Sequence, residues 1–216
     1  VNEITVAENN PNYHSAGNCL IETSTKTLIA GCNSSIIPSD GSVTRIQKYA
    51  FDGCNELASI TIPSVVTEIS YAAVARCDGL ETITVADGNP VYHSAGNCII
   101  ETATNTLVIG CKNSVIPSDG SVTRIQKDAF TLCINMENFH IPNGVTEIGD
   151  AAFYCCPDIN SIFIPDSVIS IGVNAFFSCR SLSDIYYAGT IEQWNAITKG
   201  DNWDTETGWG TATGSY

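Results

Sequence analysis

The chain has 216 residues, of which 44% are hydrophobic and 15% are charged, and its formal net charge is −14 with a pI near 4.3. So acidic a surface repels nucleic acid and anionic membranes, which excludes both as expected partners. No apolar run approaches the roughly 18 residues that cross a bilayer, so we expect no membrane insertion within this sequence.

A long internal repeat begins almost at the first residue. Residues 4–51 return 79 positions later as residues 83–130, and 36 of the 48 aligned positions are identical. Within the 79-residue unit, equivalent apolar positions follow one another at intervals of 31, 25 and 23 residues. Periods of this length indicate a solenoid, in which each coil buries its apolar face only against its neighbours.

Each unit opens with an insert that is typical of a β-hairpin. Its sequence is CLIETSTKTLIAGC in the first unit and CIIETATNTLVIGC in the second. A cysteine pair brackets each hairpin, Cys19 with Cys32 and Cys98 with Cys111, at the same separation of 13 residues. If the register sets these ends opposite each other, an oxidising exterior permits one disulfide in each hairpin. Buried thiols at all four positions are the alternative.

The shorter coils carry the motif I-x-I directly before proline, as at Ile60 and Ile62. This alternation of β-branched residues is typical of a short strand with one buried face. The proline that follows lacks an N–H and ends the ladder. We therefore expect one short parallel strand in each coil.

Between the strands, the motif A-F-x-x-C-x-x-L has apolar residues three or four apart, which is the spacing of a helical turn or a short 3₁₀ piece. Free cysteine is among the most buried residue types, whereas a zinc site needs closely spaced cysteine pairs. We expect the motif's cysteines to stack as small buried hydrophobes. They are Cys54, Cys77, Cys133, Cys156 and Cys179.

The segment after Tyr187 differs in composition and is rich in Gly, Thr, Asp and Trp. A solenoid needs a cap that shields its last coil. Ile191, Trp194 and Ile197 lie three residues apart, so we predict one helical turn over that coil. The predicted organisation is a solenoid over 1–187, built from the duplicated units 4–82 and 83–161, and a C-terminal cap and tail over 188–216.

The coil I-P-x-x-V-T-x-I-G-x-x-A-F-x-x-C, seen from Ile141 to Cys156, resembles the leucine-rich repeat of the bacterial BspA-like class. The inserts at 10–23 and 89–102 are similar to the elongated units of that class, and the resemblance covers nearly all of residues 1–197. It implies an α/β fold: a right-handed leucine-rich-repeat solenoid with one short parallel strand per 23–31-residue coil, β-hairpin inserts and short helical or 3₁₀ turns. It also implies a bacterial surface or secreted protein with a role in adhesion, and no catalytic site.

The residue between the two inward positions of each strand faces the open side of the sheet. Along the array the last three such residues, His140, Phe163 and Tyr186, are aromatic, at the roughly 4.8 Å spacing of neighbouring strands. Stacked rings with open faces suit a partner's side chains or a sugar ring, so we predict a ligand-binding row of these three with Thr61 and Thr84. Packing that only stabilises the sheet is the alternative. The full row reads Thr5, Ile36, Thr61, Thr84, Val115, His140, Phe163 and Tyr186.

The sequence gives little support for a catalytic function. His14, His93 and His140 are the three histidines, and no nucleophile with base and orienting group accompanies them. We predict no catalytic residue, no metal site and no cofactor.

The predicted function is a non-catalytic extracellular binding or adhesion module that presents its strand face to a protein partner, such as a host or matrix protein. A structural spacer in a larger surface protein and a carbohydrate-binding module with a glycan partner are the alternatives. We expect the chain to lie outside the cell or at the bacterial cell surface, as part of a longer protein.

Overall fold

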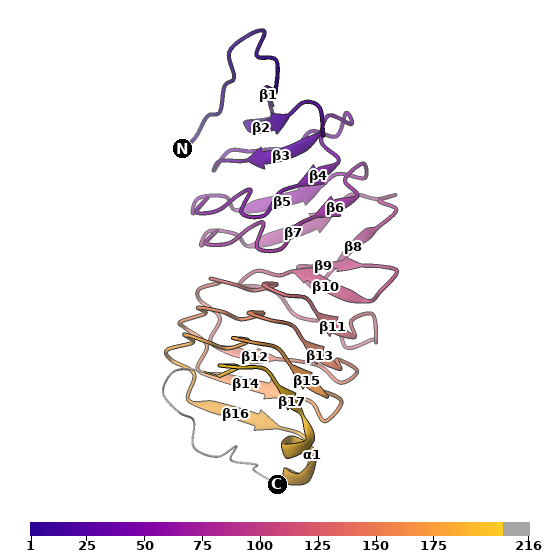
Figure 1. The fold of residues 1–216 in the computed structure, drawn as a ribbon, viewed down its shortest axis with the longest axis vertical. Coiled ribbons are helices and arrows are strands. Elements are labelled where there is room, and N and C mark those ends of the chain that lie inside the picture. The colour runs from indigo at the N-terminus through magenta and orange to yellow at the C-terminus, as the bar shows by residue number, and fades with distance from the viewer. Residues whose placement is uncertain (205–216) are drawn as a thin grey trace.

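The strands stack one coil after another along a single axis, as the repeat predicts. The structure is a computed structural model that describes residues 1–204. β1 (Tyr13–Ala16) lies near one end of the array and α1 (Ile191–Ala196) near the other (Figure 1). The chain is therefore an elongated parallel β-solenoid with little helix.

The predicted I-x-I strands form one side of the solenoid. They pair in parallel with their neighbours in an unshifted register, and in most of them alternate residues are buried. This confirms the period-2 prediction. The strands make a two-stranded sheet of β5 (Ser59–Ile62) and β7 (Thr82–Val85) and a three-stranded sheet of β12 (Asn138–His140), β14 (Ser161–Ile164) and β16 (Asp184–Tyr187).

A second side, which we call the hairpin side, carries strands that the sequence analysis did not predict. Each is only two residues long. Five of the six end at the isoleucine of the V-x-x-I pattern and bury it, whereas the sixth consists of Thr198 and Lys199. The five-stranded sheet has β1, β2 (Cys19–Glu22), β3 (Thr27–Ala30), β4 (Arg45–Ile46) and β6 (Glu68–Ile69). The seven-stranded sheet has β8 (Tyr92–Ala95), β9 (Cys98–Glu101), β10 (Thr106–Ile109), β11 (Arg124–Ile125), β13 (Glu147–Ile148), β15 (Ser170–Ile171) and β17 (Thr198–Lys199).

The predicted hairpins are confirmed and belong to these sheets. β2 and β3 pair antiparallel, as do β9 and β10 in the second unit. β3 then pairs in parallel with β4, and β10 with β11. Each insert thus starts a new parallel ladder on the hairpin side.

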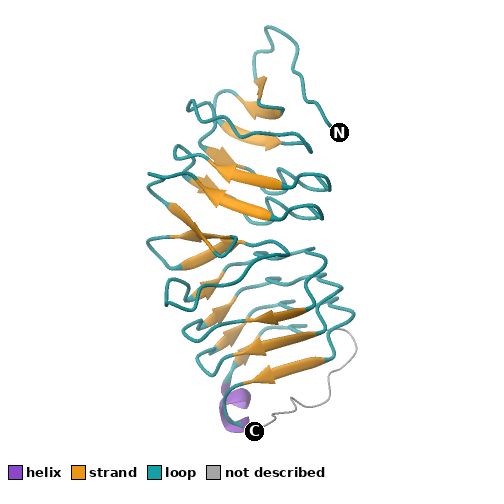
Figure 2. Ribbon diagram, turned by 180° about the vertical axis from the view of Figure 1, so that it is seen from behind, coloured by secondary structure: helices purple, strands orange, loops and turns teal. Residues whose placement is uncertain are grey.

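The A-F-x-x-C segments form hydrogen-bonded turns instead of helix, and Figure 2 shows loops and turns between the strands throughout the solenoid. Cys54 N–H donates to Phe51 O at 3.0 Å, an i to i+3 bond of the 3₁₀ kind. In the coil of Phe153, however, Ala151 and Cys155 both have positive φ, at 51° and 52°. Left-handed residues break a right-handed helix, so each segment is limited to a single turn.

The core is a column of stacked side chains. Phe130, Phe153 and Phe176 are fully buried, with ring centroids 5.0 and 5.2 Å apart. Beside them, the Cys156 and Cys179 thiols each donate to a phenylalanine carbonyl of the preceding coil at 3.0 Å. The predicted cysteine stack is therefore confirmed in these coils, and its thiols also satisfy backbone acceptors.

The side formed by the I-x-I strands, which we call the strand side, is not continuous, so the prediction of one unbroken row of eight outward residues is wrong. Thr5, Ile36 and Val115 lie outside strands. At the end of β7, Val85 N–H donates to Ser94 Oγ at 3.0 Å, and Val115 N–H donates to Gly96 O at 2.8 Å. Ser94 and Gly96 lie where the chain enters the hairpin, which we call the hairpin corner. The hairpin corner thus accepts the backbone hydrogen bonds that would otherwise join Val85 and Val115 to a neighbouring strand. The same contacts recur in the first unit, so the sheet is interrupted once in each.

After the last coil, the chain folds back over the end of the core. Thr190 caps α1 in a reciprocal pair of hydrogen bonds with Gln193. The predicted helical turn is confirmed, with Ile197 buried but Ile191 exposed. β17 extends the hairpin side, and the Trp203 ring meets Phe176 edge-on at 6.5 Å. Residues 205–216 of the predicted tail lie outside the described residues, so the division into solenoid and cap stays a prediction.

Candidate functional site: the aromatic row

His140, Phe163 and Tyr186 lie side by side on β12, β14 and β16, and we call them the aromatic row. The strand register pairs His140 with Phe163 and Phe163 with Tyr186. Their ring centroids are 5.8 and 4.6 Å apart, with interplanar angles of 30° and 16°. The period-2 pattern places them outward because their sequence neighbours on each strand fill the core. The three rings therefore form one continuous stack.

The aromatic row lines a shallow groove on the strand side. Phe163 is 40% exposed, and Asn143, Pro165 and Ala188 lie along the groove beside the rings. Aromatic side chains are enriched at the cores of protein interfaces relative to the rest of the surface. The groove offers apolar contact together with the polar groups of His140, Asn143, Tyr186 and Tyr187.

The stacking changes what the row presents to a ligand. Phe163 lies between the other two rings, so both its faces are covered and its edge faces outward. A sugar that stacks on an aromatic residue needs a free ring face. The expectation of open ring faces is therefore wrong for Phe163. Edges of this kind suit apolar side chains better than a sugar ring.

Thr61 and Thr84 belong to a different part of the strand side. They lie opposite each other on β5 and β7, and their hydroxyl oxygens are hydrogen-bonded at 2.9 Å. The hairpin corner separates this pair from the aromatic row. The structure therefore divides the five predicted ligand-binding residues between two sheets. The threonine pair adjoins a groove of its own, beside Ile36, which is 76% exposed.

The four hairpin cysteines are free thiols in the structure. Cys19 and Cys98 each donate to the carbonyl two residues earlier, at 3.5 Å, and Cys32 donates to Asn18 O at 3.6 Å. Burial raises the pKa of Cys19 to about 11 and that of Cys98 to about 12, which keeps both protonated at neutral pH. A protonated thiol is a slow partner in disulfide exchange.

Intact mass with and without reductant tests the predicted disulfides. Because the structure holds all four of these cysteines as free thiols, we expect no change in mass on reduction. A gain of about two mass units per bond would show that Cys19–Cys32 or Cys98–Cys111 forms in the oxidised protein. Cys19→Ser and Cys98→Ser would then assign the bond, since each removes one pair and leaves the other intact.

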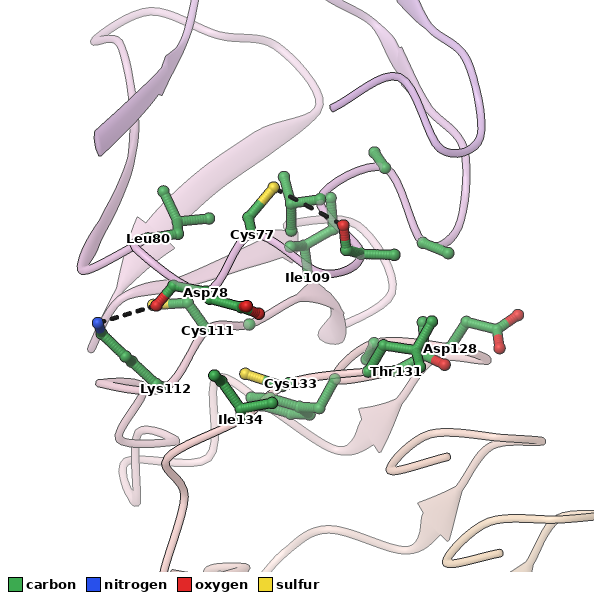
Figure 3. A pocket seen from close by; sticks show the side chains of 18 residues that line it. Cys77, Asp78, Leu80, Ile109, Cys111, Lys112, Asp128, Thr131, Cys133 and Ile134 are labelled. Carbon is green, nitrogen blue, oxygen red and sulfur yellow. Dashed lines mark hydrogen bonds between the residues drawn. The ribbon is translucent and has the colours of Figure 1, made fainter. Parts of the chain in front are cut away.

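A small cavity lies at the junction between the two units, and Figure 3 shows the side chains that line it. Cys77, Cys111 and Cys133 contribute thiols, and Lys112 Nζ donates to Asp78 O at 3.0 Å. Burial raises the pKa of Cys133 to about 12 and raises the pKa of Cys77 as well. Such thiols are poor nucleophiles and poor metal ligands. We therefore assign the cavity no catalytic or metal-binding role.

The hairpin side has a polar groove that the sequence analysis did not identify, because its strands were not predicted. Its outward residues align in register across β10, β11, β13, β15 and β17. Arg124 pairs with Glu147 at 2.8 Å, and both side chains are exposed, so the pair contributes little stability. The groove is lined in part by Thr106, Arg124, Gln126, Glu147, Ser170 and Thr198.

Two further observations concern the described residues. Across residues 1–204, no helix is long and apolar enough to span a membrane. In the same range, no three side chains of His, Cys, Asp or Glu gather where a metal ion would bind them together.

Comparison with solved structures places the fold among bacterial leucine-rich-repeat proteins. A leucine-rich repeat protein from Eubacterium ventriosum ATCC 27560 is 25% identical, with a TM-score of 0.57, and the match covers 68% of this chain and 40% of that one. A leucine rich cell surface protein from Faecalibacterium prausnitzii A2-165 is 28% identical, with coverages of 73% and 55% and a TM-score of 0.46. A leucine-rich repeat protein from Bacteroides ovatus ATCC 8483 is 26% identical, with coverages of 81% and 45% and a TM-score of 0.45. The chain spans about half the length of these proteins.

Sequence comparison agrees with the coil architecture. No curated protein matches the chain. The BspA type leucine rich repeat region does match, in 6 copies over residues 21–97 and 105–197, which include nearly all of the coils described above and part of each hairpin. The chain belongs to the BspA-type leucine rich repeat family.

Proposed function

We propose that the chain is a non-catalytic binding module of the bacterial cell surface, which presents its strand side to a protein partner in adhesion. The observation that carries the proposal is the aromatic row. Exposed apolar patches mark interaction sites on protein surfaces, and aromatic residues are enriched at the centres of protein interfaces. The repeat family, whose solenoids offer extended binding surfaces, agrees with this role.

The geometry of the row favours a protein over a glycan as the partner. Phe163 has neither ring face free, so sugar stacking is left to the outer faces of His140 and Tyr186. A partner's aliphatic or aromatic side chain needs no free face, because it packs on ring edges and into the groove beside Pro165 and Ala188.

A structural spacer is the second candidate, and the rigidity of the stack supports it. If the rings serve to hold the three strands together, their removal should destabilise the sheet whether or not a partner is present. The two functions therefore differ in two measurable respects, since a binding module loses its ligand when the rings are removed and a spacer loses stability.

The test is binding of the purified protein to an array of host matrix proteins and glycans. We expect saturable binding to a protein member, abolished by combining His140→Ala, Phe163→Ala and Tyr186→Ala. The thermal midpoint should stay close to that of the unmodified protein, because these side chains point outward from the core. Failure of every member to bind, or a large fall in the midpoint of the triple variant, would favour the spacer.

A matched control removes a second ring stack from the same coils. Tyr154 and Phe177 stack at 5.8 Å with an interplanar angle of 8°, on the turns between the strand side and the hairpin side. Tyr154→Ala combined with Phe177→Ala should therefore retain binding. Loss of binding in this variant as well would mean that the effect follows coil stability and not the strand side.

A further inference from the structure

The two copies of the repeat meet at an interface whose polar contacts are specific. Asn89 Nδ2 donates to Pro63 O and to Val66 O, both at 2.9 Å. Tyr92 Oη accepts a hydrogen bond from Ile69 N–H at 3.1 Å. These two side chains of the second unit therefore satisfy three backbone groups of the last coil in the first unit.

These contacts close the ladder of the first unit. β6, which contains Ile69, is the last strand of the five-stranded sheet, so its outer N–H has no further strand to pair with. The Tyr92 hydroxyl takes that place, and the tyrosine is only 7% exposed. A buried N–H without an acceptor destabilises the folded protein, and the Tyr92 hydroxyl removes this penalty.

The first unit carries the same two residues at its own leading end, as Asn10 and Tyr13. Asn10 Oδ1 accepts from the N–H groups of Asn12 and Tyr13 at 3.0 and 2.9 Å. Asn89 Oδ1 is held in the same way by the corresponding backbone groups, at 2.9 and 2.8 Å. The amide of Asn10 is thus oriented like that of Asn89. Within the described residues, however, its Nδ2 has no acceptor and the Tyr13 hydroxyl has no donor, and Tyr13 is 37% exposed.

The apolar residues beside these polar groups also differ in burial between the two units, and those of the second unit are the more buried. Ile99 and Val108 of the second unit are buried and belong to the core of the first. Their counterparts Leu20 and Ile29 are only half-buried. The leading end of the first unit therefore has the polar and apolar parts of the unit interface without the coil that would cover them. Figure 1 shows β1 and its preceding loop at this end of the array.

We propose that this leading end, defined by Asn10, Tyr13, Leu20 and Ile29, docks one more coil with the pattern I-P-x-x-V-x-x-I, in tandem with the first unit in one polypeptide. Such a coil supplies the carbonyls of its proline and valine positions to Asn10 and the N–H of its second isoleucine to Tyr13. The interface between the two units already contains the equivalent hydrogen bonds of Asn89 and Tyr92.

A second copy of this chain is a poor source of that coil. Its last coil of the pattern runs from Ile164 to Ile171. There β15 is already paired with β17, and Trp203 packs over Phe176. The carbonyl and N–H groups that Asn10 and Tyr13 would need are therefore not all free at that end.

The test is a chain in which residues 4–82 are repeated once in tandem before the rest of the sequence. This places an internal Asn10 and Tyr13 against a coil of the required pattern. We expect one cooperative thermal transition, with a midpoint above that of the natural chain. Separate unfolding of the added unit would overturn the proposal.

Removing one tyrosine hydroxyl at a time isolates its hydrogen bond. The three variants are Tyr13→Phe in the natural chain, Tyr13→Phe at the internal copy of the extended chain, and Tyr92→Phe in the natural chain. Tyr13→Phe should leave the thermal midpoint of the natural chain unchanged, because the Tyr13 hydroxyl has no partner among the described residues. At the internal copy of the extended chain it should lower the midpoint by about 3 °C, as Tyr92→Phe should in the natural chain. Equal midpoints with and without the internal hydroxyl, while Tyr92→Phe retains its effect, would contradict the docking role.

Sedimentation of the natural chain distinguishes a docked coil of the same polypeptide from a docked coil of a second copy of the chain. We expect a monomer at micromolar concentration, since no second copy offers the matching coil. A dimer that dissociates on Tyr13→Asp would assign the leading end to self-association and overturn the tandem proposal.

Discussion

Replacing Phe153 with alanine should lower the free energy of unfolding by about 3–5 kcal/mol. The ring is fully buried and lies between Phe130 and Phe176 at 5.0 and 5.2 Å, with Phe139 edge-on at 5.1 Å. Its removal leaves a cavity that the stacked neighbours cannot fill, because each is held by its own coil. The midpoint of urea denaturation measures the loss.

Val74 supplies the matched control for this substitution. It occupies the same repeat position as Phe153 but is only half-buried and has no ring to stack on. Val74→Ala should cost roughly a third as much as Phe153→Ala, because fewer buried methylene groups are lost. Similar costs for the two substitutions would contradict the large unfilled cavity that we expect from Phe153→Ala.

Gly172→Val should destabilise the protein by about 3 kcal/mol, the upper end of what overpacking costs. A Cβ on Gly172 would lie 2.4 Å from Asp150 N and 2.6 Å from Gly149 C. These are backbone atoms of the preceding coil, so they cannot rotate away as a side chain can. Glycine at this position sets how closely neighbouring coils approach on the hairpin side, and we expect valine to force them apart.

Ser70→Val tests whether the cost comes from the approach of the coils or from valine itself. Ser70 follows Ile69 in its coil, just as Gly172 follows Ile171, but it already carries a Cβ. The same valine should therefore cost less than about 1 kcal/mol there. If both substitutions were equally destabilising in denaturant, the close backbone approach at Gly172 would not be the cause.

Part of the candidate site could be predicted from the sequence alone. The outward position of His140, Phe163 and Tyr186 follows from alternation along each strand, and the 23-residue interval sets them on successive coils. Thr61 and Thr84 follow the same alternation. Their separation from the aromatic row was not predictable, because the hydrogen bond from Val115 N–H to Gly96 O depends on where the hairpin corner folds.

The short strands of the hairpin side also could not be predicted from the sequence pattern. Two residues such as Glu147 and Ile148 are too few to show a period of two. They become strands only because the coils before and after place Arg124 and Ser170 in register on either side. Here the stacking of the coils creates the secondary structure.

The sequence by itself determined which residues face inward, the length of each coil, the hairpin inserts and the family, because these follow from apolar spacing within a single coil. Only the tertiary structure decided how coils pair. It showed that the strand side is interrupted, that the aromatic rings cover one another's faces, and that Asn10 and Tyr13 lack the partners that Asn89 and Tyr92 have. The physical reason is that backbone donors and acceptors 23 or more residues apart compete for partners, and the outcome depends on the distances between coils.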